Sequence, residues 1–251
     1  MVEVNLRDDE RFDRLMRYDL DIIQSKSVFS FSLDALLLDN FAYFPSHDHA
    51  SIVDLCSGNG VLPLTLSKRT KSHVYGVEIQ ERLSDMAERS VRHNGLEKEI
   101  TIYNRDLADI YDLFPKDSVD VITCNPPYFP VSETSRKNPN EQLAIARHEL
   151  TTNLESVIQV TSNLLKMNGR AFFVYRPARL LEMITLFDKY HLTPKKIQFI
   201  YPKKDSESNM MLVEAIKHGK ERGLKVLHPL FIHDENGDYL PEIKDIIYGT
   251  D

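Results

Sequence analysis

The feature that most constrains this fold is a regular alternation of apolar segments and amphipathic segments that begins near residue 50. Short apolar segments typical of buried strands lie at 51–55, 74–79, 100–104, 119–124 and 170–176. Strands separated by helical patterns indicate βαβ units, and such units build a mainly parallel sheet that is covered on both faces. We therefore predict an α/β fold from residue 51 onward.

Between the strand-like segments, apolar residues recur with helical spacing at 61–69, 81–95, 151–169 and 178–190. Gly95 and Gly169 stand where glycine commonly ends a helix. Two later strand-like segments, 194–202 and 209–217, are joined by a short polar stretch, which is typical of an antiparallel hairpin. The prediction is a seven-stranded, mostly parallel sheet with an antiparallel edge hairpin and helices on both faces.

Residues 1–45 precede this pattern, and we expect them to form an N-terminal extension packed on a main domain at 46–251. Phe12, Leu15 and Met16 share one side of a helix predicted over 9–20. Alternation over 21–32 predicts a strand or a hairpin. Ser32 is a candidate N-cap for a helix that Pro45 ends.

The composition excludes several protein classes. A net charge of −7 among 251 residues argues against nonspecific coating of nucleic acid, and no segment has the length of a membrane helix. The charged N-terminus is unlike a signal peptide, so we expect a cytoplasmic protein, and two cysteines are too few for a disulfide framework or a cysteine-based zinc site. Residues 166–225 nevertheless carry 13 Lys and Arg against 6 Asp and Glu, which permits a local phosphate-binding face.

Three successive strand ends carry groups suited to a nucleoside-containing ligand. In "DLCSGNG", residues 54–60, Gly58 and Gly60 allow a tight turn and close approach of the backbone to a ligand. Pro63 stands where a dinucleotide-binding loop would have its third glycine, which weakens a nicotinamide or flavin interpretation. Glu78 ends the next strand, where a carboxylate can accept from ribose hydroxyls. Asp106 follows the third strand, where a carboxylate can accept from an adenine amino group.

The order of "DLCSGNG", "VEI", "NRD" and "NPPY" resembles the class I methyltransferases that use S-adenosylmethionine (SAM). The resemblance implies a Rossmann-like fold and SAM as the cofactor, with Glu78 at the ribose and Asp106 at the adenine. Cys56 replaces the first glycine of the usual loop. The cofactor-binding residues that the resemblance implies in this core are Asp54, Cys56, Gly58, Gly60, Glu78, Asp106 and Asn125.

The fourth strand runs into "NPPYFP", residues 125–130, and this corner suits methylation of a planar amine. The lone pair of such an amine is delocalised, and two acceptors placed around its N–H groups orient that pair toward a methyl donor. The Asn125 side chain and the Pro126 carbonyl supply two acceptors, Pro127 stiffens the corner, and the Tyr128 ring offers a surface for stacking. We predict that these four residues are catalytic, and that Tyr128 and Phe129 contact the substrate.

The longer pattern resembles the bacterial tRNA(Val) adenine-37 methyltransferases, from "ERFDRLMRYDL" through "NPPYFP" and "ARHEL" to "NGRAFFVYRPARLLEM". In that family the segment around "FSLDA" closes over the methionine end of the cofactor, which assigns Ser32 and Asp34 to cofactor binding. The implied partner is tRNA, at an anticodon loop whose target base is already unpaired. Arg136 and Lys137 are candidate substrate contacts in the polar segment that follows the corner. We expect a monomer, with no membrane and no metal.

Three alternatives remain open from the residues alone. A glutamine methyltransferase of release factors shares "NPPY" but usually carries a separate helical N-terminal domain. A ribosomal RNA guanine or DNA adenine amino methyltransferase is the second alternative, although a DNA enzyme would normally need a further recognition domain. The third is an inactive SAM-binding module that chaperones RNA.

The two cysteines provide a test of the assumed strand order. Cys56 follows the first strand of the main sheet and Cys124 ends the fourth. In the expected fold these two strands are neighbours. We therefore predict that the thiols lie close together near the cofactor end of the sheet and remain reduced.

Overall fold

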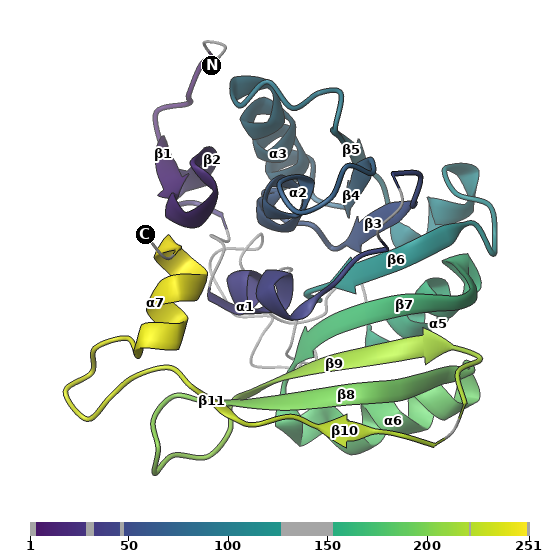
Figure 1. Cartoon of the computed structure of the whole chain (residues 1–251). Helices are drawn as coiled ribbons and strands as arrows, with labels where there is room; N and C mark the ends of the chain where they lie inside the picture. The colour runs from purple at the N-terminus through teal and green to yellow at the C-terminus, as the bar shows by residue number, and fades with distance from the viewer. Residues whose placement is uncertain (1–3, 29–32, 46–47, 127–152, 221, 250–251) are drawn as a thin grey trace, which may run out of the picture.

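The computed structural model describes residues 4–28, 33–45, 48–126, 153–220 and 222–249 (Figure 1). Within these ranges, nine strands form one mixed sheet in the order β10-β8-β9-β7-β6-β3-β4-β5, and β11 also pairs with β8. The strand bounds are β3 Ile52–Leu55, β4 Val74–Glu78, β5 Ile100–Asn104, β6 Val119–Cys124, β7 Leu165–Tyr175, β8 Leu192–Tyr201, β9 Met210–Lys217, β10 Lys225–Val226 and β11 Leu230–Phe231.

The sheet is parallel except at β9, which runs antiparallel to both β7 and β8. The seven main strands therefore match the predicted seven-stranded sheet with its antiparallel hairpin. The hairpin of β8 and β9 lies toward one edge, as predicted, and the two-residue strands β10 and β11 add to the outer side of β8.

Helices cover both faces of the sheet (Figure 1). Along β7, Phe172 and Val174 pack toward α1, α2, α3 and α7, whereas Ala171, Phe173 and Tyr175 pack toward α5 and α6. This alternation follows from the two-residue period of a strand that is buried on both faces. The helix bounds are α1 Leu33–Phe41, α2 Val61–Ser67, α3 Glu81–His93, α5 Leu154–Leu164, α6 Leu180–Lys189 and α7 Pro241–Tyr248, with 3-10 turns η1 Met16–Tyr18, η2 Leu107–Asp112 and η4 Pro177–Arg179. In the described ranges, none of the helices has both the length and the apolar character that crossing a bilayer requires.

The predicted helix over 9–20 is wrong. The chain there forms β1, Glu10–Leu15, and β2, Leu20–Ser25, an antiparallel hairpin closed by η1. Phe12 stacks on His93 of α3 with ring centroids 4.2 Å apart, whereas Met16 is 57% exposed. The three apolar residues thus do not share one buried helical face, and the strand pairing prevails because α3 supplies a surface for the hairpin.

The predicted helix stop at Gly169 is also wrong. Helix α5 ends at Leu164, and Leu165 already begins β7. The pairing of β6 with β7 shifts register between Val119 and Val121, so residues 166–169 form an irregular start to the strand. A Cβ on Gly169 would lie 2.9 Å from the carbonyl oxygen of Lys166. Glycine is therefore needed here because it lets two backbone segments lie close together inside the strand.

Candidate functional site

The carboxyl ends of β3, β4 and β6 meet at one edge of the sheet. Asp54 on β3 lies opposite Thr123 on β6, and Leu55 lies opposite Cys124, immediately before Asn125. Strand β4 flanks β3 on its other side and ends at Glu78. Ligands of open α/β sheets bind at this edge, so the described site residues come together where such a ligand is expected.

The loop from Cys56 to Gly60 turns back against β4. The Ser57 amide donates to the Val77 carbonyl at 3.0 Å, and the Gly58 amide donates to Glu78 Oε2 at 2.9 Å. Gly58 and Gly60 have φ angles of 56° and 87°, in the left-handed region that favours glycine. The glycines predicted from the sequence are therefore required by the path of the loop.

The two glycines differ in their surroundings. A Cβ on Gly60 would lie 2.8 Å from the Cβ of Ala87, because α3 packs against the start of α2 there. A Cβ on Gly58 would meet no atom of the described residues within 4 Å. Gly60 thus permits helix packing, while Gly58 keeps open the space in front of the loop.

Glu78 and Asp54 are buried carboxylates with raised pKa values. Burial raises the pKa of Glu78, although the amides of Gln80 and Gly58 donate to it and oppose the shift. Burial also raises the pKa of Asp54 well above its usual range, against the hydroxyl of Thr123, which donates to Asp54 Oδ1 at 2.7 Å. Such shifts concentrate at functional sites, where a ligand later supplies the missing partners.

This donor set fits a SAM-like cofactor. Asp54 Oδ2 and Ser57 Oγ are buried and have no hydrogen-bond partner among the residues described. Two carboxylates and a hydroxyl suit a ligand that carries ribose hydroxyls and a cationic amino-acid end. The open space at Gly58 lies in the same loop.

The predicted amine-binding corner is described only at its start. Asn125 is half-buried and Pro126 is buried at the end of β6. The pairing of β6 with β3 brings this corner beside the Cys56–Gly60 loop, as a transfer between the two would need. The other predicted residues of the corner and its flanks lie outside the described residues: Ser32, Pro127, Tyr128, Phe129, Arg136 and Lys137.

Asp106 caps a 3-10 turn, and Asp34 lies at the start of a helix. Asp106 is the N-cap of η2, and its Oδ1 accepts from the Ala108 amide at 2.9 Å. Asp34 lies half-buried in the first turn of α1. Their assignment to the cofactor stays a prediction.

The prediction for the cysteines is confirmed. Both are free thiols, and they lie close enough that a hydrogen bond with Cys56 is among the causes that raise the pKa of Cys124, after burial. This proximity follows from the pairing of β3 with β6.

Several basic residues of 166–225 form ion pairs within the fold. Arg170 and Lys196 pair with Glu214, and Arg179, which follows the carboxyl end of β7, pairs with Glu182. Two further basic side chains donate hydrogen bonds to backbone carbonyls: Arg176 to that of Asn209 and Lys195 to that of Arg222. Lys203 and Lys204 are exposed in the loop after β8. The excess of basic residues in the sequence is thus partly used within the fold.

Two residues of the site were not singled out from the sequence. Thr123 bonds Asp54, and a polar residue inside the apolar segment 119–124 was the available signal. Asn59 lies between the two glycines and is 2% exposed. It donates to the Ile23 carbonyl at 3.0 Å, and no sequence signal pointed to that partner.

The fold and the site together define a Rossmann-like class I methyltransferase. The strand order with its antiparallel β9, the Gly-rich turn after β3 and the acidic end of β4 all belong to that architecture. Within this class, the chain belongs to the methyltransferase small domain family, whose model matches residues 19–199.

Curated relatives match over most of the chain. One from Flavobacterium psychrophilum, named tRNA1(Val) (adenine(37)-N6)-methyltransferase, is 26% identical over 208 residues and covers 81% of this chain and 86% of the relative. Another with the same name, from Porphyromonas gingivalis, is 26% identical over 241 residues and covers 90% of this chain and 89% of the relative.

Solved structures share the fold. A predicted O-methyltransferase from Agrobacterium tumefaciens has a TM-score of 0.67 at 22% identity, over 86% of this chain and 96% of that one. Geranyl diphosphate C-methyltransferase from Streptomyces coelicolor, solved with Mg²⁺, geranyl diphosphate and S-adenosylhomocysteine, has a TM-score of 0.56 at 15% identity. It covers 73% of this chain and 79% of its own.

Proposed function

We propose that this chain transfers the methyl group of SAM to the N6 amino group of adenine 37 in tRNA1(Val). The observation that carries the proposal is the pairing of β3 with β6, which sets Asn125 beside the Gly-rich loop. Relatives that bear this activity in their names match over most of the chain and supply the choice of substrate.

The cofactor is held by the carboxyl ends of β3 and β4 in this proposal. When bound, SAM supplies an electrophilic methyl group on a sulfonium. Glu78 accepts from the ribose hydroxyls, and Asp54 with the Cys56–Gly60 loop holds the methionine end. Ser32 and Asp34 close over that end from the N-terminal extension, residues 1–45, while Asp106 faces the adenine. The extension packs on the main domain, residues 46–251.

Asn125 orients the reacting amine. Its side-chain oxygen and the Pro126 carbonyl accept from the two N–H groups of adenine, so the nitrogen lone pair points at the methyl group. Pro127 fixes the corner, and Tyr128 and Phe129 hold the base. A methylated, positively charged amine is acidic enough to lose its proton without a strong base.

An anticodon loop is a suitable substrate because its bases are already unpaired, which reduces the cost of placing one in a pocket. In this proposal a monomer acts in the cytoplasm, and Arg136 and Lys137 contact the phosphates of the tRNA. Binding to tRNA then weakens as salt rises, because phosphate contacts release counterions.

The test incubates the protein with methyl-labelled SAM and separate pools of tRNA, ribosomal RNA, DNA and release factor. We expect label in tRNA and N6-methyladenosine at position 37 by nucleoside mass spectrometry. The Asn125→Ala variant should bind S-adenosylhomocysteine yet lose turnover. Label in release factor with none in tRNA would instead assign the glutamine methyltransferase activity.

A further inference from the structure

The outer edge of β2 is completed by side chains rather than by another strand. One edge of β2 pairs with β1, and its opposite edge faces α3 and the Cys56–Gly60 loop. The Asp21 amide donates to Asn94 Oδ1 at 3.0 Å, and Asn94 Nδ2 donates back to the Asp21 carbonyl at 2.6 Å. Two residues on, the Ile23 amide donates to Ser90 Oγ at 2.9 Å, and its carbonyl accepts from Asn59 Nδ2 at 3.0 Å.

Asn59 differs from the other two side chains because it belongs to the loop, whereas Ser90 lies in α3 and Asn94 is the C-cap of that helix. It stands directly between Gly58 and Gly60 and is buried. On its β4 side this loop is fastened by the bond from Ser57 to the Val77 carbonyl and by the bond from Gly58 to Glu78. On the opposite side, the hydrogen bond from Asn59 to the Ile23 carbonyl connects the loop to β2.

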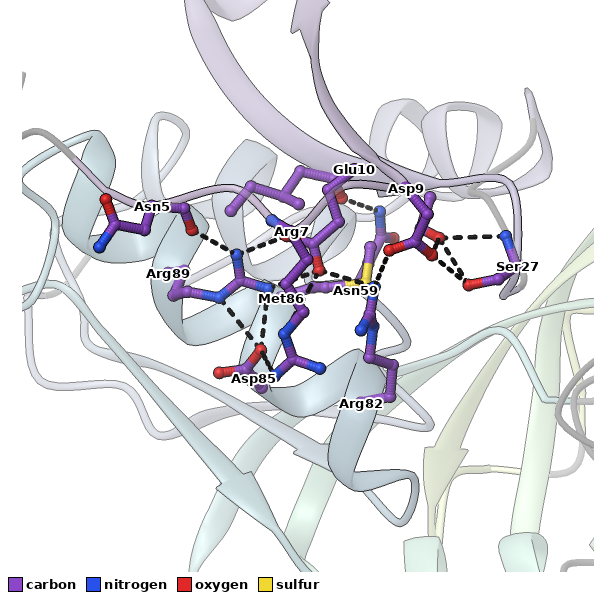
Figure 2. Close-up of polar contacts among 12 residues, drawn as sticks. Asn5, Arg7, Asp9, Glu10, Ser27, Asn59, Arg82, Asp85, Met86 and Arg89 are labelled. Atoms are coloured by element: carbon purple, nitrogen blue, oxygen red, sulfur yellow. Dashed lines mark hydrogen bonds and ion pairs between the residues drawn. The ribbon is translucent and has the colours of Figure 1, made fainter.

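Ion pairs with α3 hold the hairpin that accepts this hydrogen bond in place. The Glu10 side chain is fully buried and forms ion pairs with Arg89 at 2.6 Å and Arg82 at 2.9 Å, both on α3 (Figure 2). Asp9 pairs with the same Arg82 at 2.8 Å and accepts from Ser25 at 2.6 Å. The hydrogen bonds from Arg89 lower the pKa of Glu10 although burial alone would raise it, so the pair is ionised at neutral pH.

We propose that Asn59 is a positioning residue for the cofactor, through which the N-terminal hairpin holds the Gly-rich loop in its binding conformation. This inference rests on the proposed function. A left-handed, glycine-containing loop has many accessible conformations when it is free, so fixing both of its sides lowers the entropy lost on binding a ligand. The effect belongs to cofactor affinity and not to the methyl-transfer step.

The chain offers a matched control. Asn94→Ala removes hydrogen bonds from the same edge of the same strand, but it leaves the loop's own link to β2 in place. Asn59→Asp preserves the size of the side chain and removes the donor to the Ile23 carbonyl. Comparison with Asn94→Ala separates loss of the bond between loop and hairpin from a general loss of hairpin stability. Comparison with Asn59→Asp separates it from loss of side-chain volume.

The experiment titrates S-adenosylhomocysteine into the full-length wild type and each variant by calorimetry, beside thermal unfolding. We expect Asn59→Ala and Asn59→Asp to raise Kd about tenfold, equivalent to about 1.4 kcal/mol. Asn94→Ala should raise Kd less than about threefold while lowering Tm at least as much as Asn59→Ala. In tRNA methylation, the Asn59 variants should raise KM for SAM and leave kcat at saturating SAM within about threefold of wild type.

Hydrogen exchange gives an independent readout. Coupling between two sites is reciprocal, so binding of S-adenosylhomocysteine should slow amide exchange at residues 20–25, strand β2, in the wild type. In Asn59→Ala, binding should leave the exchange of these residues unchanged. Equal Kd values for wild type and Asn59→Ala, or equal Kd changes in the Asn59 and Asn94 variants, would overturn the inference alone. A wild type that binds no S-adenosylhomocysteine would overturn the proposed function and this inference with it.

Discussion

Alanine substitutions at Gly58 and Gly60 should separate folding from cofactor binding. Both glycines have positive φ angles, of 56° and 87°, and a Cβ in this region costs about 1–2 kcal/mol. At Gly60 the new methyl group would also lie 2.8 Å from the Cβ of Ala87, and overpacking of this kind costs about 1–3 kcal/mol more. Gly60→Ala should therefore lose about 2–5 kcal/mol of unfolding free energy, and Gly58→Ala about 1–2 kcal/mol.

Urea unfolding followed by circular dichroism measures the first effect. With a slope of about 2–3 kcal/mol per molar urea, Gly60→Ala should unfold at a midpoint about 0.7–2.5 M lower than wild type. Calorimetry with S-adenosylhomocysteine measures the second effect. The Gly58 methyl group would enter the open space in front of the loop, so Gly58→Ala should raise Kd by at least about tenfold, or about 1.4 kcal/mol.

The order of the two variants is the decisive result. If Gly58→Ala proved the less stable protein, the packing of Gly60 against Ala87 would not be the dominant constraint. If Gly58→Ala were stable and bound the ligand as the wild type does, the space in front of Gly58 would not be the cofactor site.

Substitutions at three further residues test the buried polar groups. Because burial raises the pKa of Glu78 and ribose hydroxyls require its ionised form, affinity for S-adenosylhomocysteine should fall as pH is lowered through that raised pKa. Glu78→Gln should bind more weakly with a flatter pH profile, whose remaining slope comes from Asp54; a Gln variant with a profile as steep as that of the wild type would contradict this. Glu10→Gln should lose about 3 kcal/mol of unfolding free energy at pH 7, since it removes the buried carboxylate that pairs with buried Arg89 and half-buried Arg82. The pKa of Glu10 is lowered, so its stabilisation is present above the ordinary glutamate pKa and is lost as pH falls through the folded value. Urea midpoints of variant and wild type should converge as pH falls below the ordinary glutamate pKa, and a constant gap would refute the assignment. Thr123→Val should lose about 1–3 kcal/mol in urea unfolding because it removes the hydroxyl bonded to buried Asp54, whereas Thr123→Ser should lose less.

The alternation of strands and helices was predictable because its signals are local. Apolar runs, caps and glycines are read within a few residues of each other, and parallel strands then bring their carboxyl ends to one edge. Asp54 and Glu78 could be placed at that edge for this reason. The confirmed proximity of Cys56 and Cys124 depends on the same strand order.

The hairpin could not be predicted in this way. Phe12, Leu15 and Met16 have helical spacing, but Phe12 and Leu15 lie in β1 and Met16 lies in η1. Strand β1 is stabilised by α3, where Arg89 pairs with Glu10, 79 residues away. Asn59 likewise reads as an ordinary loop residue, since its partner Ile23 lies 36 residues earlier in the chain. Residues whose role depends on such distant partners carry no periodic signal.

The separation between the hairpin and its partners has a consequence for biosynthesis. The Ile23 amide bonds Ser90, which is synthesised 67 residues later, and the Asp21 amide bonds Asn94, which is synthesised 73 residues later. A two-stranded hairpin is at best marginally stable alone, and translation adds about 5–20 residues per second. The first strands to leave the ribosome therefore remain unfolded for several seconds, with Ile22 and Ile23 open to chaperones, until α3 emerges and gives them a place to dock.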